Sequence, residues 1–245
     1  MGSKSRIKKQ ILPILQGIID DNNITTYIEP FVGGANVIDS IKCENKLAYD
    51  NHEYLIELYN KFKQDSGCLP IEVSKEHYGD VRECFNQNSD KYPKWYVGAV
   101  GFLASYNGRW FDGGYSGKRV VGTGKERDYF SEAKRNLEAQ RDSILGVEFK
   151  HSDFRNIDIP KGSLIYCDIP YQDTKKYSTS KGFDYDEFWS WARLMSENNI
   201  VIVSEQQAPE DFKVIWEQEL KRTIDNTKRV KVTEKLFALD KITLK

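Results

Sequence analysis

Apolar residues in the first quarter of the chain follow two alternating spacings, and these predict alternating helices and strands. Isoleucine and leucine recur at helical intervals over residues 7–19, which predicts an amphipathic helix. Runs rich in β-branched and aromatic residues at 24–29 and 47–50 predict two short strands, with helices after them at 35–41 and 53–62. This strand–helix–strand–helix order indicates an α/β fold with a parallel sheet.

The strand pattern is absent between residues 75 and 140. Helical spacing predicts helices at 76–85 and 94–104 and a third that starts near Ser131. The glycine-rich segment 105–127 interleaves aromatic and basic residues and is expected to be a loop. Because a loop this long is usually functional, we predict a functional insertion, mainly helical, at 75–140.

The strand pattern resumes after the predicted insertion. Apolar runs at 147–151, 164–167 and 200–203 predict strands, and the last two have the continuous apolar character of strands buried on both faces of a sheet. A helix is expected at 187–195 and a late strand at 230–239. The segments on either side of the insertion therefore form a single sheet domain.

Composition supports a folded protein with local rather than global charge. The chain has 245 residues, 39% of them hydrophobic and 30% charged, which suits one large α/β domain carrying an inserted subdomain. The net charge of −1 means that any nucleic-acid-binding face must be local. Basic residues outnumber acidic ones within 109–135 and within 221–235, so both segments are suited to contact phosphates.

Cysteine and histidine positions give no sign of a metal site. The four cysteines form no C-x-x-C pair and the three histidines have no metal-ligand spacing. No apolar run approaches the ~20 residues needed to span a bilayer. The basic segment 1–10 also lacks the apolar stretch of a signal peptide. We therefore expect a metal-free, monomeric protein of the cytoplasm, or a viral protein acting in the host cytoplasm.

The segment Asp168-Ile169-Pro170-Tyr171 follows a predicted buried strand, at the edge where open α/β sheets bind ligands. An aromatic amino group such as N6 of adenine is a poor nucleophile, because its lone pair is delocalised into the ring. The Asp168 carboxylate and the Ile169 carbonyl can accept its two hydrogens and draw out the lone pair. Tyr171 can stack on an extruded base. An ordinary turn is the alternative interpretation of this segment alone.

A second candidate site is the segment Glu29-Pro30-Phe31-Val32-Gly33-Gly34, whose glycines allow the backbone to approach a ligand closely. Asp50 ends the next predicted strand and is placed to accept from ribose hydroxyls. This spacing alone does not distinguish S-adenosylmethionine from NAD. The chain lacks the full G-x-G-x-x-G pattern, which disfavours NAD.

Taken together, these motifs resemble DNA adenine methylases of the Dam type (alpha class, D12 family), and the likeness covers nearly the whole chain. The motifs that carry it, in chain order, are Gly2-Ser3-Lys4-Ser5-Arg6, Glu29 to Gly34, Asp50-Asn51, Tyr106-Asn107-Gly108 and Cys167 to Tyr171. The resemblance implies a Rossmann-like methyltransferase sheet, mostly parallel with one antiparallel late strand. It also implies a catalytic domain at 1–74 and 141–245 and a mainly helical target-recognition subdomain at 75–140.

The resemblance further implies S-adenosyl-L-methionine as the cofactor and a site-specific, adenine-N6 methyltransferase activity on double-stranded DNA. Asp168, Ile169, Pro170 and Tyr171 are then the catalytic residues, and Asp168 lies between cofactor and base. The expected cofactor-binding residues are Lys4, Glu29, Pro30, Phe31, Gly33, Gly34, Asp50, Asn51, Asp153, Phe154 and Asp168.

DNA contacts are expected from the insertion and from the segment after the catalytic motif. The residues assigned to DNA are Tyr106, Asn107, Arg109, Trp110, Lys118, Arg119, Lys125, Arg127, Lys175 and Lys176. The last two, with Tyr177, are interpreted as a flap over the flipped base.

The chain departs from the Dam pattern at three places. Ile169 replaces a proline, but the carbonyl acceptor is retained, so retained catalysis is expected. An aromatic residue usual before the Gly-Ser-Lys segment is missing, so this part of the cofactor wall is either absent or supplied by Phe31. The segment after Gly108 differs, so the resemblance assigns no recognition sequence. The alternatives are methylation of a protein glutamine amide or an RNA amine, and a DNA-binding protein that retains the fold without catalysis.

Overall fold

The computed structural model describes residues 4, 7–120, 122, 124–170, 182–223 and 229–240, and the side chains of these residues except at 221–223 and 229–230. A seven-stranded sheet forms its centre, with the strand order β5-β2-β1-β6-β7-β9-β8. The strands are β1 (Thr26–Glu29), β2 (Asn45–Asp50), β5 (Val147–His151), β6 (Leu164–Asp168), β7 (Ile200–Glu205), β8 (Phe212–Thr223) and β9 (Arg229–Leu239).

Strand directions confirm the predicted α/β sheet. The five strands from β5 to β7 are parallel, with Ile28 of β1 in register with Leu47 of β2 and Ile165 of β6. Only β9 runs against its neighbours β7 and β8, as expected for one antiparallel late strand. The outer strand β8 was not predicted, because its apolar residues are interrupted by charged ones on the exposed face.

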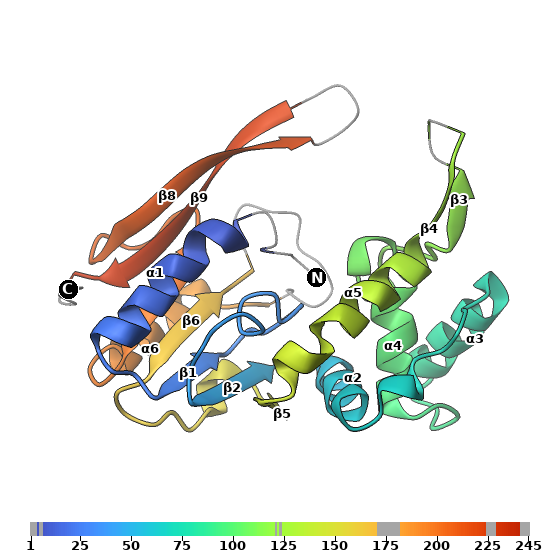
Figure 1. Ribbon diagram of the computed structural model, residues 1–245, viewed down its shortest axis with the longest axis horizontal. Helices are drawn as coiled ribbons and strands as arrows, with labels where there is room; N and C mark the ends of the chain where they lie inside the picture. Colours follow the sequence, from blue (N-terminus) through green and yellow to red (C-terminus); the bar gives the residue numbers. More distant parts are fainter. Residues whose placement is uncertain are drawn as a thin grey trace.

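Two helices cover opposite faces of the sheet (Figure 1). Alternate residues of the strands divide between two apolar clusters, as the two-residue period of a strand requires: Tyr27 faces one cluster and Ile28 the other. Helix α1 (Lys8–Asp21) packs Ile11 and Leu15 into the first cluster, while α6 (Tyr185–Met195) packs Phe188 into the second. The sheet is therefore the middle layer of three.

Residues between β2 and β5 build the lobe beside the sheet. Helix α2 (Glu53–Gln64) packs against β2 and β5, and α4 packs on α2. The lobe contains α3 (Lys75–Asn86), α4 (Lys94–Leu103), the hairpin β3 (Lys118–Val120) and β4 (Glu126–Asp128), and α5 (Tyr129–Ile144). Short 3₁₀ turns lie at Ser66–Cys68, Tyr106–Gly108 and Phe154–Asn156.

Two details of the predicted organisation were wrong. Residues 35–41 form successive turns instead of a helix, because Gly33 and Ala35 both adopt positive φ angles, 46° and 52°. The insertion also contains the β3–β4 hairpin, in a segment predicted to be a loop. Its sequence does carry a hairpin signal, since β-branched residues precede a glycine-rich turn.

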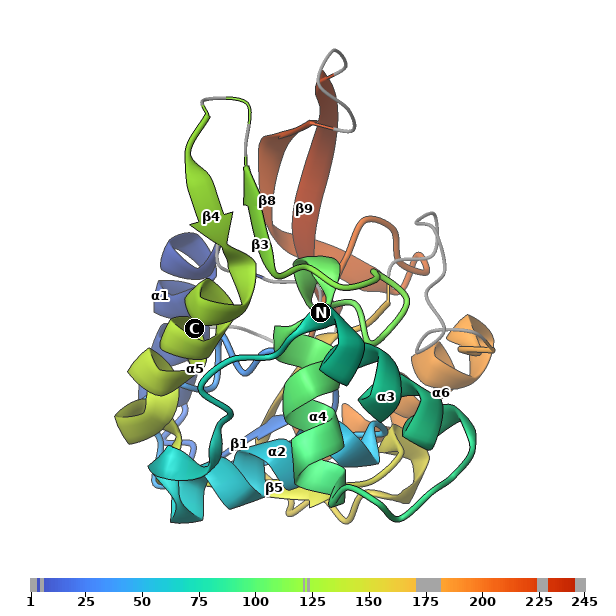
Figure 2. The same ribbon diagram turned by 90° about the vertical axis from the view of Figure 1, so that its right-hand side faces the viewer.

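Two antiparallel ribbons project on the side of the sheet where the parallel strands end. Strand β9 pairs with β7 only from Ala238 to Lys235, opposite the end of β7, so the rest of β9 pairs with β8 alone. Figures 1 and 2 show the β8–β9 ribbon and the β3–β4 hairpin extending in the same direction. Among the described residues, no helix combines the length and apolar character needed to cross a bilayer.

Candidate active site

Two acidic residues end neighbouring parallel strands at the centre of the sheet. Glu29 is the last residue of β1, and Asp168 is the last residue of β6. The chain continues from β1 to β2 on one side, whereas β6 continues to β7 on the other, so the strand order reverses between β1 and β6. Such a reversal is where open α/β sheets bind their ligands.

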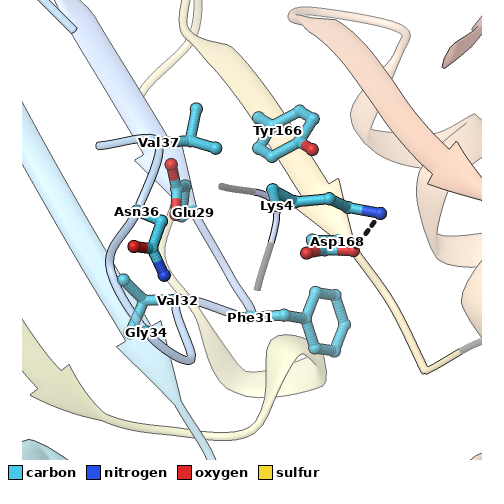
Figure 3. A pocket seen from close by; sticks show the side chains of 9 residues that line it. All are labelled: Lys4, Glu29, Phe31, Val32, Gly34, Asn36, Val37, Tyr166 and Asp168. Carbon is cyan, nitrogen blue, oxygen red and sulfur yellow. Dashed lines mark ion pairs between the residues drawn. The ribbon is translucent and has the colours of Figure 1, made fainter. Parts of the chain in front are cut away.

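A pocket opens at this reversal (Figure 3). Its empty volume is about 240 Å³, including space open to solvent. Five of the predicted site residues line it: Lys4, Glu29, Phe31, Gly34 and Asp168. Val32, within the predicted glycine segment, lines it as well, whereas Asn36, Val37 and Tyr166 were not predicted. These three carry no signal in the sequence, because they look like ordinary core or turn positions.

The Lys4 ammonium bridges two carboxylates at the wall of the pocket. Its Nζ lies 3.0 Å from Oδ1 of Asp168 and 3.3 Å from Oε2 of Glu234 on β9. Lys4 is 8% exposed and Glu234 is 3% exposed, whereas Asp168 is 25% exposed. Burial lowers the pKa of Lys4, but the carboxylates of Asp168 and Glu234 raise it by more, so Lys4 stays protonated.

Glu29 is a buried carboxyl group whose protonation depends on its surroundings. Tyr27 Oη donates a hydrogen bond of 2.9 Å to its Oε1. Burial raises the pKa of Glu29 to about 8, and the negative charges of Asp168 and Asp39 act in the same direction. The Tyr27 hydroxyl opposes this shift. Near neutral pH the pocket therefore carries fewer negative charges than its carboxyl groups suggest.

Asp50 is tied to the glycine segment. Its Oδ2 accepts from the Gly33 backbone N–H at 3.0 Å, and its Oδ1 accepts from the His52 N–H at 3.0 Å. Tyr59 Oη donates to the Gly33 carbonyl at 3.0 Å. Burial raises the pKa of Asp50, and the two N–H donors oppose this rise. A carboxylate has about four acceptor positions, so Asp50 keeps capacity for a ligand hydroxyl.

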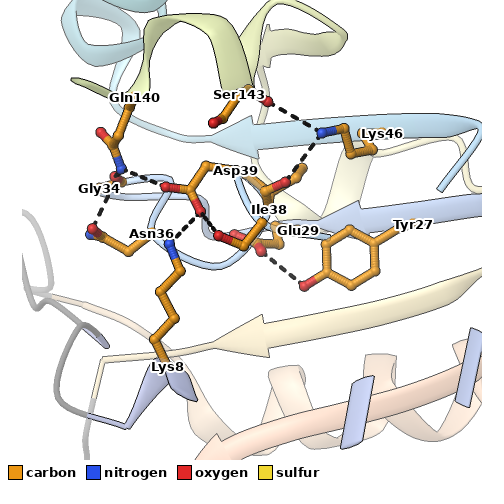
Figure 4. A network of polar contacts seen from close by, with 11 residues as sticks. Lys8, Tyr27, Glu29, Gly34, Asn36, Ile38, Asp39, Lys46, Gln140 and Ser143 are labelled. Atoms are coloured by element: carbon orange, nitrogen blue, oxygen red, sulfur yellow. Dashed lines mark hydrogen bonds and ion pairs between the residues drawn. The ribbon is translucent and has the colours of Figure 1, made fainter. Parts of the chain in front are cut away.

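A polar network supports the turns that follow Gly34 (Figure 4). Asp39 accepts from Lys8 of α1 at 2.6 Å and from Gln140 of α5 at 3.1 Å. Gln140 also lies 3.3 Å from the Gly34 carbonyl and 3.4 Å from Oδ1 of Asn36. The last helix of the insertion is thus bonded directly to the pocket wall.

Aromatic rings extend from the pocket toward the end of β5. The Phe31 ring centroid lies 5.5 Å from that of Phe154, which is buried. Asp153 accepts from the Arg155 N–H and pairs with its guanidinium, both at 3.0 Å. Pro30 is buried, and Asn51 is exposed with its carbonyl 3.2 Å from His151 Nε2. These predicted residues surround the carboxyl ends of β1, β2 and β5 without all lining the pocket.

The segment predicted to be catalytic leaves β6 through two residues that are held by contacts. Ile169 is 2% exposed and packs in the apolar cluster on the α6 face. The Pro170 carbonyl accepts from Tyr185 Oη at 2.9 Å, which anchors the segment to the start of α6. Tyr171, Lys175, Lys176 and Tyr177, to which roles were assigned from sequence, lie outside the described residues.

Most residues assigned to DNA are accessible. Tyr106 and Asn107 are exposed, as are Lys118, Arg119, Lys125 and Arg127 on the hairpin, while Arg109 is half-buried. Two of the hairpin arginines already have partners within the chain. Arg127 makes a bidentate pair with Glu132, donating from Nε to Oε1 and from Nη2 to Oε2, and Arg119 donates to the Tyr115 carbonyl.

The placement of Trp110 differs from the expectation of a DNA contact. Its side chain is 7% exposed, and its ring centroid lies 4.2 Å from that of His52 and 4.8 Å from that of Phe102. A large aromatic side chain buries most area in the interior, and here the space is supplied by Gly101, where a Cβ atom would overlap the Trp110 ring. Trp110 is a core residue joining the insertion to α2.

Within the part of the chain that the structure describes, no group of three or more histidine, cysteine, aspartate or glutamate residues is arranged to hold a metal ion. The pocket combines one ammonium, two carboxyl groups and two aromatic rings. This donor set suits an organic ligand that carries both charges.

Comparison with known proteins connects this pocket to a family. Residues 1–198 match the family described as D12 class N6 adenine-specific DNA methyltransferase. The type II methyltransferase M.MjaIII of Methanocaldococcus jannaschii is 26% identical over 211 residues, which cover 76% of this chain and 72% of that protein. The type II methyltransferase M.FokI of Planomicrobium okeanokoites is 26% identical over 190 residues, covering 70% of this chain but 28% of that protein.

Solved structures show a weaker likeness. The rRNA methyltransferase aviRa of Streptomyces viridochromogenes superposes over 96% of this chain and 84% of its own, with a TM-score of 0.40 and 10% identity. A TM-score this low carries no argument about substrate or mechanism.

Proposed function

The chain belongs to the D12 class of N6 adenine-specific DNA methyltransferases, and from this premise we propose that Asp168, Ile169 and Pro170 form the centre of its catalytic site. The enzyme transfers a methyl group from S-adenosylmethionine to N6 of adenine in DNA. The observation that carries the assignment is the position of Asp168, which ends β6 at the reversal of strand order and lines the central pocket.

The pocket and the strand ends around it have the groups that the cofactor needs. S-adenosylmethionine carries a carboxylate, an ammonium and a sulfonium, together with a ribose and an adenine ring. The Lys4 ammonium suits the carboxylate, and the Asp168 carboxylate suits the positive groups. Glu29, whose pKa is raised to about 8, can accept a hydrogen bond from the cofactor's ammonium. Asp50 suits a ribose hydroxyl, and Phe31 beside Phe154 suits the adenine ring. When bound, the cofactor would supply a methyl group on a positively charged sulfur. That sulfur would become a neutral thioether once the methyl group is transferred.

The catalytic segment makes the amino group of the target adenine nucleophilic. In this assignment, the Asp168 carboxylate accepts one N6 hydrogen and the Ile169 carbonyl accepts the other. These two acceptors would orient the lone pair of N6 toward the methyl group that the bound cofactor would supply, and N6 would give up one proton to water. The protein contributes positioning and electrostatics. Because the acceptor at position 169 is a backbone carbonyl, the side chain is free to pack in the core.

The base must leave the duplex to reach this pocket, which lies at the edge of the sheet. We assign the contacts with double-stranded DNA to the insertion at 75–140, through Tyr106, Asn107 and the exposed basic residues of the β3–β4 hairpin. The β8–β9 ribbon extends on the same side (Figure 2), and its basic residues Lys231 and Lys235 are assigned to phosphates as well. One chain therefore presents two projecting ribbons beside one pocket, which favours action as a monomer.

The test compares Asp168→Ala with the unchanged enzyme and with Asp142→Ala, a change at a carboxylate that is 93% exposed. DNA from cells expressing each variant is sequenced by a method that reads methyladenine directly, which also gives the recognition sequence. Asp168→Ala should leave no methyladenine, whereas Asp142→Ala should match the unchanged enzyme. Calorimetry with S-adenosylhomocysteine should still detect cofactor-site binding by Asp168→Ala. Methylation by that variant at the normal level would contradict the role of Asp168.

A further inference from the structure

Glu234 is an acidic residue that the ribbon brings to the active site. It is the first residue of β9 beyond the end of β7, because the last pair between these strands joins Glu205 and Lys235. Its side chain lies on the same face as Leu236, which is buried in the apolar cluster on the α1 side. Glu234 is 3% exposed, so its carboxylate is buried.

The Lys4 ammonium connects Glu234 to Asp168, since its Nζ lies 3.3 Å and 3.0 Å from their carboxylate oxygens. A buried carboxylate is costly unless a positive charge and hydrogen bonds compensate for its lost hydration. Asp168 is the more exposed of the two carboxylates, at 25%, and it lines the pocket. The ammonium is therefore shared between an interior carboxylate and a catalytic one.

This sharing affects the strength of Asp168 as an acceptor. Asp168 must take a hydrogen bond from a weakly acidic amino group, and an ammonium bound to the same carboxylate competes for its lone pairs. Glu234 offers Lys4 a second carboxylate within the same buried site. Without that carboxylate, the ammonium would bind Asp168 more tightly.

We propose that Glu234 is a positioning residue for methyl transfer, which retains the Lys4 ammonium while the Asp168 carboxylate accepts the N6 amino group of the target adenine. The inference rests on the proposed role of Asp168. It adds a residue from the late strand to a site otherwise formed by the N-terminal segment, β1 and β6.

The experiment measures single-turnover methyl transfer to unmethylated phage DNA, with tritiated S-adenosylmethionine and DNA both at saturating concentration. Glu234→Gln keeps the side-chain shape and removes the charge. Because the substitution removes a charged partner of the ammonium, its rate should fall about 10- to 100-fold. Glu234 is proposed to act in the methyl-transfer step and not in cofactor binding. The affinity for S-adenosylhomocysteine should therefore change by less than about threefold. Glu234→Asp should recover part of the rate.

Glu217→Gln is the matched control, since Glu217 lies on the same ribbon but is exposed. Its rate should equal that of the unchanged enzyme. Urea unfolding of each variant detects a purely structural effect. Such an effect would lower the free energy of unfolding and would reduce the rate and the cofactor affinity together.

A double-mutant cycle tests the dependence on Lys4. In Lys4→Met, no ammonium remains for Glu234 to hold, so adding Glu234→Gln should slow the reaction by less than about twofold. An equal loss in both backgrounds would overturn the inference, as would a normal rate for Glu234→Gln alone. An inactive unchanged enzyme would instead refute the proposed function itself, so the two failures are distinguishable.

Discussion

The carboxylate of Asp50 accepts a hydrogen bond of 3.0 Å from the backbone N–H of Gly33, and so joins the end of β2 to the glycine segment after β1. Gly33 has a positive φ of 46°, a conformation that glycine adopts without strain. One carboxylate therefore shapes the pocket wall and, in the proposed function, also binds the ribose. The two roles need different properties of the side chain. Holding the Gly33 backbone needs only a hydrogen-bond acceptor, whereas binding the ribose is strengthened by the negative charge.

The substitution Asp50→Asn should separate these roles. The asparagine side chain would keep one oxygen acceptor but lose the charge, so affinity for S-adenosylhomocysteine should fall about tenfold, in line with a charged hydrogen bond. Calorimetry measures this directly. The matched control is Asp65→Asn, because Asp65 also accepts from a backbone N–H, that of Gly67 at 3.1 Å, but caps the 3₁₀ turn at Ser66–Cys68 instead of joining the glycine segment. Equal affinities for all three proteins would exclude a ligand contact by Asp50.

Glu29 should give the protein a specific pH dependence of stability. The pKa of Glu29 is raised from 4.5 to about 8 in the folded protein by burial. Between these values the folded state holds a proton that the unfolded state releases, so this contribution to the free energy of unfolding decreases as pH rises. The limiting slope is about 1.4 kcal/mol per pH unit for one group. Above the folded pKa the loss is complete.

Glu29→Gln should remove this slope, because glutamine stays neutral and can still accept from Tyr27. Urea unfolding at several pH values between about 5 and 8 compares the variant with the unchanged protein. Glu44→Gln, at an exposed position, serves as the control and should keep the original slope. Parallel curves for Glu29→Gln and the unchanged protein would show that Glu29 is ionised throughout this range.

The sequence predicted the centre of the sheet well, because buried parallel strands are short apolar runs that end at functional residues. Asp168, Glu29 and Asp50 were all placed correctly at strand ends for this reason. The turns at 35–41 were mistaken for a helix because periodicity does not reveal the positive φ angles of Gly33 and Ala35. Apolar spacing describes which face is buried, and it says less about backbone conformation.

Contacts between segments that are distant in the sequence could not be predicted from local sequence patterns. Glu234 reaches Lys4 across 230 residues, and no local signal marks a charged strand residue as buried. Trp110 was expected at the surface but is buried. Its sequence context does not distinguish the two placements, because aromatic residues among glycines and arginines are common both on nucleic-acid-binding loops and in small cores. Only the helix packing around Gly101 distinguishes the two.

Gln140 should couple the insertion to the cofactor pocket. Its amide nitrogen lies 3.1 Å from Oδ2 of Asp39 and 3.3 Å from the Gly34 carbonyl. Gln140→Ala removes these contacts, and the pocket wall should become less ordered, weakening S-adenosylhomocysteine binding by about three- to tenfold. Calorimetry provides the measurement. Gln87→Ala, which loses only an exposed contact with Glu83, should leave the affinity unchanged, and the same result for Gln140→Ala would limit that residue to a structural role.

Trp110 and Tyr106 should respond in opposite ways to truncation. Trp110 is buried among His52, Tyr54 and Phe102, so Trp110→Ala should lower the free energy of unfolding by about 3–5 kcal/mol. Tyr106 is 40% exposed, so Tyr106→Ala should change stability by about 0.5 kcal/mol or less.

Binding to fluorescent duplex DNA should show the reverse order. Tyr106→Ala should weaken binding about tenfold if its ring stacks on a base, since stacking contributes about 1–3 kcal/mol per base. Trp110→Ala, measured well below its unfolding transition, should bind DNA as tightly as the unchanged protein, because its ring supports the loop from within. A stable Trp110→Ala variant with a selective loss of DNA binding would instead place that ring at the interface, and the buried position of Trp110 would then describe only the free enzyme.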